Sequence, residues 1–476
     1  MTDDFFRSRL DAMIDLRHPL VVLATRMPWA QIETLLAPLF VRRNREGQVA
    51  EDVDLFGSTA QLAGAGVSVA GRPRLSIRLL TGLLYLKHLY NLSDESVCER
   101  LAQDVNFQYY CGEACFQPHL PCSPMNLVRF RHALGEAGVD ELLATTVAVA
   151  ANMKAVTLVE FKHAIVESTV REKASAFPTD SRLLEVARTK LVQLARRAGL
   201  ALKQTDERKG KQLHRVLKRQ RTILGRMPCN IDRKLSNITE SYRNPLELWL
   251  ARAWQICRQR PKDRGKLYAP EVECIGKGKA GQPYEFGVKA YLTITEKRGL
   301  IVGARTFAGN PYDGHTLAEQ LKQTRILPEG VSGEPSPKTE LTDLGYRGGD
   351  ATVAPVTLIH RGKCKTLSSR RRRWLKRRQA VEPVIERVKQ DHGLKRCGLT
   401  GVDGQCTTCL LCAAGYNLRW LLLAIERAGY QAPFDATCPA IHSSPVARSP
   451  LPASTDDTSA FASRRYWLSF QPSLSP

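Results

Sequence analysis

The order of strand and helix patterns from residue 163 onward limits the fold more than any other feature of the sequence. Six short segments rich in apolar and β-branched residues predict strands, at 163–170, 271–275, 284–295, 300–305, 341–343 and 356–359. Helical patterns separate the first strand from the second and follow the fourth at 315–322, and a long basic helix comes last. This order predicts an α/β fold with a mixed sheet and helices on two faces.

The N-terminal part of the chain predicts helices only. Residues 1–150 show short apolar-periodic segments joined by turns. Ser93 is a good N-cap, and Ser123-Pro124 combines an N-cap with proline at the first helical position. This pattern suits a helix-turn-helix-like DNA-binding domain, and it equally suits a small helical bundle of another kind.

The remainder predicts one large domain and a tail. The strands fall within an α/β domain of residues 160–431, which carries a basic helical insertion at 181–260. Pro, Ser, Thr and Ala dominate residues 432–476 without periodicity, so we expect a disordered tail there.

An excess of positive charge indicates the class of partner. The chain has 70 Lys and Arg against 47 Asp and Glu, a net charge of +23. Such a charge attracts polyanions. Because basic residues accumulate in the helical insertion, a surface that binds the phosphates of a nucleic acid is favoured there, rather than a helix face that is only solvated. Nucleic acid is therefore the first partner to expect.

Apolar segments long enough to span a membrane are not expected. The best candidate, 410–425, is interrupted by Asn417 and Arg419, and the acidic start of the chain is unlike a secretory signal. We therefore expect a cytoplasmic protein without membrane contact, whose 13 cysteines stay reduced.

Three cysteines show a spacing that resembles part of a metal-cluster motif. Cys406, Cys409 and Cys412 follow C-x2-C-x2-C, but no fourth Cys or His stands at ligand distance in that run. The spacing favours small apolar side chains buried along one helix over a metal site.

Three acidic residues stand at or just past the ends of predicted core elements. Glu167 interrupts an apolar strand, Asp343 ends a strand, and Glu382 follows a run of arginines. A buried carboxylate is costly unless it is paired or bound to metal, and Mg²⁺ commonly binds through one or two carboxylates together with substrate phosphates. Each of these residues alone also fits a surface acid or a salt-bridge partner.

Several runs of residues, in this order, match one known family. The matching runs are Leu92-Ser93-Asp94-Glu95, Tyr110-Cys111-Gly112-Glu113, Glu167-Ser168-Thr169-Val170-Arg171-Glu172-Lys173, Phe177-Pro178-Thr179-Asp180, Gly309-Asn310-Pro311-Tyr312-Asp313-Gly314-His315-Thr316-Leu317, Asp343-Leu344-Gly345-Tyr346-Arg347-Gly348 and Glu382-Pro383-Val384-Ile385. Across roughly residues 70 to 430 the chain resembles the DDE transposases of bacterial insertion sequences, the "IS five" group.

The resemblance implies a ribonuclease-H-like catalytic core. In it Glu167, Asp343 and Glu382 would be the catalytic residues and would hold two Mg²⁺ ions, with Mn²⁺ as a possible substitute. Two metal ions stabilise the attacking and leaving oxygens of phosphodiester cleavage. DNA would be the partner, as terminal inverted repeats and as target, and the protein would act as a homo-oligomer associated with the nucleoid.

The resemblance also assigns basic residues to DNA phosphates. Arg378 and Lys389 fit the Arg-x3-Glu-x6-Lys part of the family's signature helix, and the basic run before Glu382 adds Arg371, Arg372 and Arg373. Spacing on a continuous helix would bring Arg378, Glu382 and Lys389 to one face. Pro383 predicts either a kink or a helix that restarts with Pro383 at its first position.

Glu167 leaves the activity open, because the family normally has Asp at this position. The extra methylene moves the carboxylate by about a bond length, and a misplacement of about 1 Å can cost about a hundredfold in rate. A DNA-binding remnant without cleavage activity is the alternative to an active transposase. A nuclease or RNA-processing enzyme on the same kind of core is a third possibility.

Overall fold

The computed structural model describes most of the chain up to residue 428. The described residues are 8–40, 75–119, 122–174, 180–200, 202, 213–235, 238–258, 272–276, 284–328, 331, 337–342, 346, 356–359, 368–399 and 401–428. All of them belong to one compact unit, Met1–Tyr430. The predicted tail at 432–476 lies outside the described residues.

Helices make up the regular structure of the described residues that precede the sheet, apart from one isolated bridge between Arg9 and Cys115. They are α1 (Leu10–Met13), α2 (Pro19–Arg26), α3 (Trp29–Leu36), the 3-10 turn η2 (Ala37–Phe40), α5 (Ile77–Leu89), α6 (Asp94–Gln103), α7 (Val105–Tyr110), α8 (Pro124–Asn152) and the 3-10 turn η3 (Glu160–Lys162).

Both predicted helix starts are confirmed. The Ser93 side chain accepts a hydrogen bond from the backbone N–H of Ser96, at 3.0 Å, and so caps α6. Helix α8 begins at Pro124, and the Asn126 side chain accepts the backbone N–H of Ser123 at 3.0 Å. Proline fits the first helical position because the N–H that it lacks has no partner within the helix.

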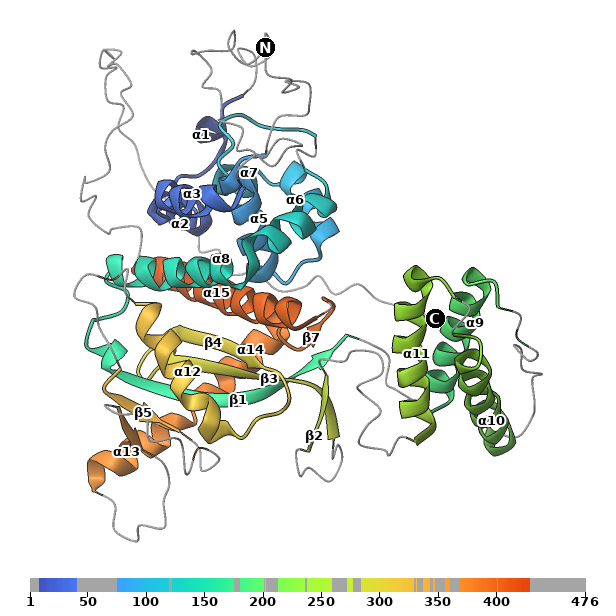
Figure 1. Cartoon of the computed structure of the whole chain (residues 1–476). Helices are drawn as coiled ribbons and strands as arrows, with labels where there is room; N and C mark the ends of the chain where they lie inside the picture. The colour runs from blue at the N-terminus through green and yellow to red at the C-terminus, as the bar shows by residue number, and fades with distance from the viewer. Residues whose placement is uncertain are drawn as a thin grey trace, which may run out of the picture. The chain divides into compact units, whose positions relative to one another are not determined.

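The sheet is mixed, as predicted, and its strands are β1 (His163–Lys173), β2 (Glu273–Gly276), β3 (Tyr284–Thr295), β4 (Ile301–Phe307), β5 (Thr339–Leu341), β6 (Thr357–Ile359) and β7 (Arg396–Cys397). Strand β3 pairs antiparallel with β1, β2 and β4, whereas β5 runs parallel to β1, and β6 runs parallel to β5. Figure 1 shows β1, β3 and β4 side by side with α12 over one face.

The other helices follow β1, β4, β6 and β7 in the chain. Between β1 and β2 lie α9 (Asp180–Arg197), α10 (Leu213–Asp232) and α11 (Glu240–Arg258), which share a hydrophobic cluster of their own. Later in the chain come α12 (Asp313–Ile326), α13 (Ser369–Arg378), α14 (Val381–Asp391) and α15 (Gly401–Ala428).

The helix predicted to run through Glu382 is interrupted. Helix α13 ends at Arg378 and α14 begins at Val381, so Pro383 is the third residue of α14 and not the first. The first turn of a helix leaves its N–H groups without intrahelical partners, which makes proline acceptable at this position. A restart of the helix was one of the two predicted consequences of Pro383, but it occurs at Val381, two residues earlier, so Arg378 and Glu382 do not share one continuous helix.

Helix α15, which contains the apolar segment 410–425, is long and apolar enough, by length and composition alone, to cross a membrane. Yet 72% of its most apolar window is buried inside the structure. The buried Asn417 side chain donates to the backbone oxygen of Ile301 at 2.8 Å and to Oγ1 of Thr146 at 3.0 Å, and accepts the N–H of Ile301 at 3.0 Å. These contacts are typical of a core helix.

Candidate active site

Glu167 lies in the middle of β1, on one face of the sheet. Successive side chains of a strand point to opposite faces, so Glu167 shares its face with His163 and Ile165. Ile165 is fully buried in the main hydrophobic cluster, to which Val384 and Val388 of α14 also belong. Glu167 thus stands on the face of the sheet that α14 covers.

The structure pairs Glu167 with Arg378. The guanidinium Nη1 donates to Oε2 of Glu167, and the two side chains are 17% and 22% exposed. Arg378 is the last residue of α13, and the break that follows leaves its side chain directed toward β1. A predicted phosphate-binding residue therefore contacts a predicted metal ligand directly.

Glu382 and Lys389 stand on α14. Glu382 is exposed in the first turn, where the positive end of the helix dipole favours an anion, and Lys389 is partly exposed in the last turn. Seven residues are about two helical turns, so the two side chains share a face of α14.

Asp343, the remaining predicted metal ligand, lies outside the described residues. Strand β5 ends two residues earlier, at Leu341, so the prediction of a strand through Asp343 is tested only in part. The residues that the structure describes contain no group of three His, Cys, Asp or Glu side chains able to hold a metal ion. The convergence of the three carboxylates stays a prediction.

Helix α13 presents an exposed basic surface and a partly buried side. Arg372 and Arg373 are exposed, while the side chain of Arg371 lies outside the described residues. Arg377 is 3.6 Å from the Glu296 carboxylate, through its Nε, and donates to the backbone oxygen of Lys297 at 3.3 Å. These contacts hold α13 against the turn between β3 and β4.

A polar cluster on the opposite face of β1 was not predicted. Asp313 accepts hydrogen bonds from Nζ of Lys289 at 2.8 Å, from the hydroxyl of Tyr291 at 2.9 Å and from Oγ of Ser168 at 3.4 Å. Burial raises the pKa of Tyr291, which keeps its hydroxyl a donor to Asp313. The run around Asp313 was noticed in the sequence, but a pairing with Lys289 depends on the strand register and has no sequence signal of its own.

Tyr346 is a core residue. It is 2% exposed and packs with Val166, Tyr291 and Leu317 between the sheet and α12. Burial raises the pKa of its hydroxyl well above the usual value. Packing is therefore the role that the structure shows for Tyr346.

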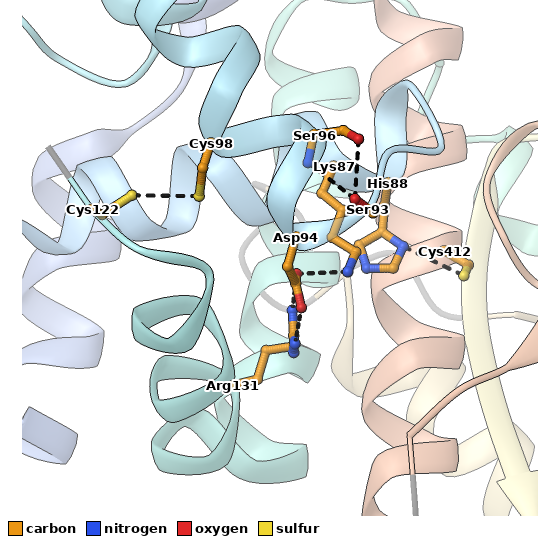
Figure 2. A network of polar contacts seen from close by, with 9 residues as sticks. All are labelled: Lys87, His88, Ser93, Asp94, Ser96, Cys98, Cys122, Arg131 and Cys412. Atoms are coloured by element: carbon orange, nitrogen blue, oxygen red, sulfur yellow. Dashed lines mark hydrogen bonds and ion pairs between the residues drawn. The ribbon is translucent and has the colours of Figure 1, made fainter. Parts of the chain in front are cut away.

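Asp94, in the Leu-Ser-Asp-Glu run, joins three helices (Figure 2). Its carboxylate accepts from Nζ of Lys87 at 2.6 Å and from both terminal nitrogens of Arg131, at 2.7 and 2.6 Å. Burial raises the pKa of Asp94, but the hydrogen bonds from Arg131 and Lys87 outweigh burial and lower the pKa to about 2. This ion-pair network connects α5, α6 and α8.

The predicted packing role of Cys406, Cys409 and Cys412 is confirmed. All three are buried in α15, and burial raises the pKa of the Cys409 and Cys412 thiols to about 12. The Cys412 sulfur lies 3.6 Å from Nδ1 of His88 (Figure 2). Protonated thiols without exposure are poor metal ligands.

Comparisons with known proteins agree with these observations. Residues 47–133 match a family described as "Transposase domain (DUF772)", and residues 251–418 match "Transposase DDE domain". The second match includes Asp343, Arg378 and Glu382, whereas Glu167 precedes it. An uncharacterized protein, ORF8 in the nfe locus of Rhizobium meliloti, is 34% identical over 209 residues, which are 44% of this chain and 88% of that protein. No solved structure matches the chain.

Proposed function

Because the chain belongs to the DDE transposases of insertion sequences, we propose that it binds the terminal inverted repeats of its element, cleaves DNA there and joins the 3′ ends to a target. The observation that carries the proposal is the position of Glu167. It stands in the middle of β1, on the face covered by α14, which bears Glu382. The excess of positive charge supports DNA as the partner.

The sheet supports a ribonuclease-H-like core. Three strands, β1, β3 and β4, pair antiparallel, and β5 and β6 continue the sheet parallel to β1. The helices before β1 would form a DNA-binding domain over residues 1–150. The helices α9 to α11 would be a basic insertion in a catalytic domain of residues 160–431.

The chain's donor set fits a divalent cation. Glu167 already accepts a cationic partner, and carboxylate oxygens are the ligands that Mg²⁺ prefers. Paired residues of β1 and β5 are 176 positions apart in the sequence, for example Ile165 and Leu341, and the same offset separates Glu167 from Asp343. This offset supports Glu167 and Asp343 as neighbouring ligands. With Glu382 of α14 they would be the residues that hold Mg²⁺, or Mn²⁺ in its place. Bound there, the metal would stabilise charge on the attacking and leaving oxygens.

The basic residues near Glu167 would bind the DNA backbone. Arg378 would exchange its bond with Glu167 for a phosphate, which a guanidinium can bind through two hydrogen bonds. Lys389 would contact a second phosphate from the last turn of α14, and the exposed Arg372 and Arg373 would add contacts that do not depend on sequence.

A catalytically impaired DNA-binding remnant is the second candidate, and the Arg378–Glu167 ion pair favours it. The longer glutamate side chain reaches Arg378, so its negative charge can stay neutralised by the guanidinium. A shorter aspartate at this position would not reach Arg378 in the same way. Cleavage of labelled inverted-repeat DNA with Mg²⁺ or Mn²⁺ by the natural chain and by Glu167→Asp separates the two candidates. Cutting by the natural chain supports the transposase, whereas binding without cutting that Glu167→Asp restores supports the remnant.

Strand transfer tests the remaining alternative of a nuclease. A transposase joins the cut ends to a target plasmid, whereas a nuclease leaves nicks without a joined product. Action as a homo-oligomer, in the cytoplasm and at the nucleoid, belongs to the same proposal. Sedimentation of the chain with inverted-repeat DNA would measure the number of protomers in the complex.

A further inference from the structure

A cavity of 450 Å³ lies at the start of the parallel strands β1, β5 and β6. The starts of these strands are joined by backbone hydrogen bonds, from Lys338 to Lys162 and from Thr357 to Lys338, each at 2.9 Å. Lys162 and Lys338 therefore stand side by side at its wall. The volume is within the usual range for small-molecule sites, roughly 300–1,000 Å³.

The described lining of this cavity is cationic and contains no acidic side chain. Lys162 and Lys338 supply the positive charge, and Thr357 and Ser368 add exposed hydroxyl groups. Such a combination suits an anion with several acceptor oxygens, and a phosphate group is the biological anion of this kind.

An aromatic wall completes the cavity. Trp374 of α13 lines it together with His163, and their ring centroids are 5.2 Å apart with the planes at 45°. Trp374 is partly exposed and packs its buried side against the main hydrophobic cluster. An indole face fixed in this way is a platform on which a planar base can stack.

Two elements, α13 and β1, each carry a residue of the cavity and a residue of the Glu167–Arg378 pair. Trp374 and Arg378 are four residues apart on α13 and so lie on the same face of that helix. His163 and Glu167 are four residues apart on β1 and share a face of the strand, about 13 Å apart along it. A ligand held by Trp374 and His163 would therefore lie on the same side of the sheet as the Glu167–Arg378 pair, one turn of α13 away from Arg378.

We propose that this cavity binds one nucleotide of single-stranded DNA, with its base on Trp374 and its phosphate at Lys162 and Lys338. Stacking on an aromatic ring is open to a base only when it is unpaired, whereas lysines bind phosphates of single and double strands alike. That the ligand is DNA rests on the proposed function, whereas binding of DNA in this cavity does not require that the chain cleaves it.

The test measures binding of the full chain to a 12-nucleotide single strand and to the same sequence as a duplex, by fluorescence anisotropy without metal. We expect Trp374→Leu to weaken single-strand binding at least about fivefold and duplex binding much less, and Trp374→Phe to restore it. Lys338→Gln should weaken both, while Lys322→Gln, which removes an exposed lysine of α12, is the matched control. Equal losses for both DNAs with Trp374→Leu, or no loss, would overturn the proposal.

A second readout separates stacking from a structural effect. A 2-aminopurine base in the single strand loses fluorescence when it stacks, and Trp374→Leu should relieve that quenching at saturating protein. Thermal unfolding shows whether each variant folds like the natural chain. Unchanged quenching in a folded Trp374→Leu variant would contradict the site, whereas an inactive chain that retains quenching would contradict only the proposed cleavage.

Discussion

Two carboxylates of similar exposure, Asp94 and Glu167, are held in different ways. Asp94 accepts three hydrogen bonds from Lys87 and Arg131, which come from two other helices. Glu167 pairs with Arg378, the terminal residue of a helix that ends beside it. The exposed fractions of Asp94 and Glu167 are 15% and 17%, so burial does not separate them.

The difference teaches how a structural carboxylate can be distinguished from a functional one. A carboxylate held by two cationic side chains from two other packed helices cannot give them up without loosening the contacts between those helices. A carboxylate paired with the end of a helix can exchange its partner for a metal ion or release it to a phosphate. Substitution of the first kind of carboxylate should lower the free energy of unfolding. Substitution of the second kind should lower the rate of DNA cleavage.

The largest effect is expected from Glu167→Gln. The amide lacks the charge that a divalent cation requires, so cleavage of inverted-repeat DNA should fall by on the order of a hundred- to a thousandfold. The urea midpoint of unfolding should stay close to that of the natural chain, because the amide oxygen can still accept a hydrogen bond from Arg378. A Glu167→Gln variant that cleaves DNA at the natural rate, or that unfolds at a clearly lower urea concentration, would contradict the distinction between the two carboxylates.

The same change at Asp94 should act on stability. Asp94→Asn leaves one acceptor oxygen for the three donors of Arg131 and Lys87 and removes the anion of these side chains, which are only 6% and 19% exposed. The free energy of unfolding should therefore fall by about 3 kcal/mol. Urea unfolding followed by circular dichroism measures this loss. Glu95→Gln, in the same helical turn, is the control, and a loss of equal size there would show that the network is not the cause.

Acid should reproduce this loss in the natural chain. The pKa of Asp94 is lowered from 3.8 to about 2, so the folded state binds its proton less readily than the unfolded chain does. The resulting stability is present above pH 4 and is lost as the pH falls to about 2, in total about 2 kcal/mol. Unfolding measured across this range should show a smaller acid loss in Asp94→Asn. Identical pH dependences of the two chains would contradict the assignment.

Local patterns predicted the elements that carry these carboxylates. Alternation and β-branched residues indicated β1 and β3, and Ser93 marked the start of the helix that bears Asp94. These signals lie within a few residues of one another.

The partners of these carboxylates could not be predicted, because they are far away in the sequence. Arg131 is 37 residues from Asp94, and Arg378 is 211 residues from Glu167. The helix break before Val381 was foreseen only as one consequence of Pro383, and its position depends on how α13 and α14 pack. The meeting of Asp343 with Glu167 stays a prediction because Asp343 lies outside the described residues.

The smallest effect is expected from Arg378→Gln, and it tests whether the Glu167 pair is exchangeable. In the natural chain Arg378 would compete with the divalent cation proposed to bind the Glu167 carboxylate. Its removal should lower the Mg²⁺ concentration for half-maximal cleavage by about threefold, a difference of less than 1 kcal/mol. Affinity for DNA should fall as well, because one phosphate contact is lost.

Titrations at saturating DNA separate the two effects, and Arg377→Gln, whose guanidinium contacts Glu296, is the matched control. A higher Mg²⁺ requirement in Arg378→Gln would mean that the arginine holds Glu167 in place for the metal, and the two carboxylates would then both depend on fixed partners.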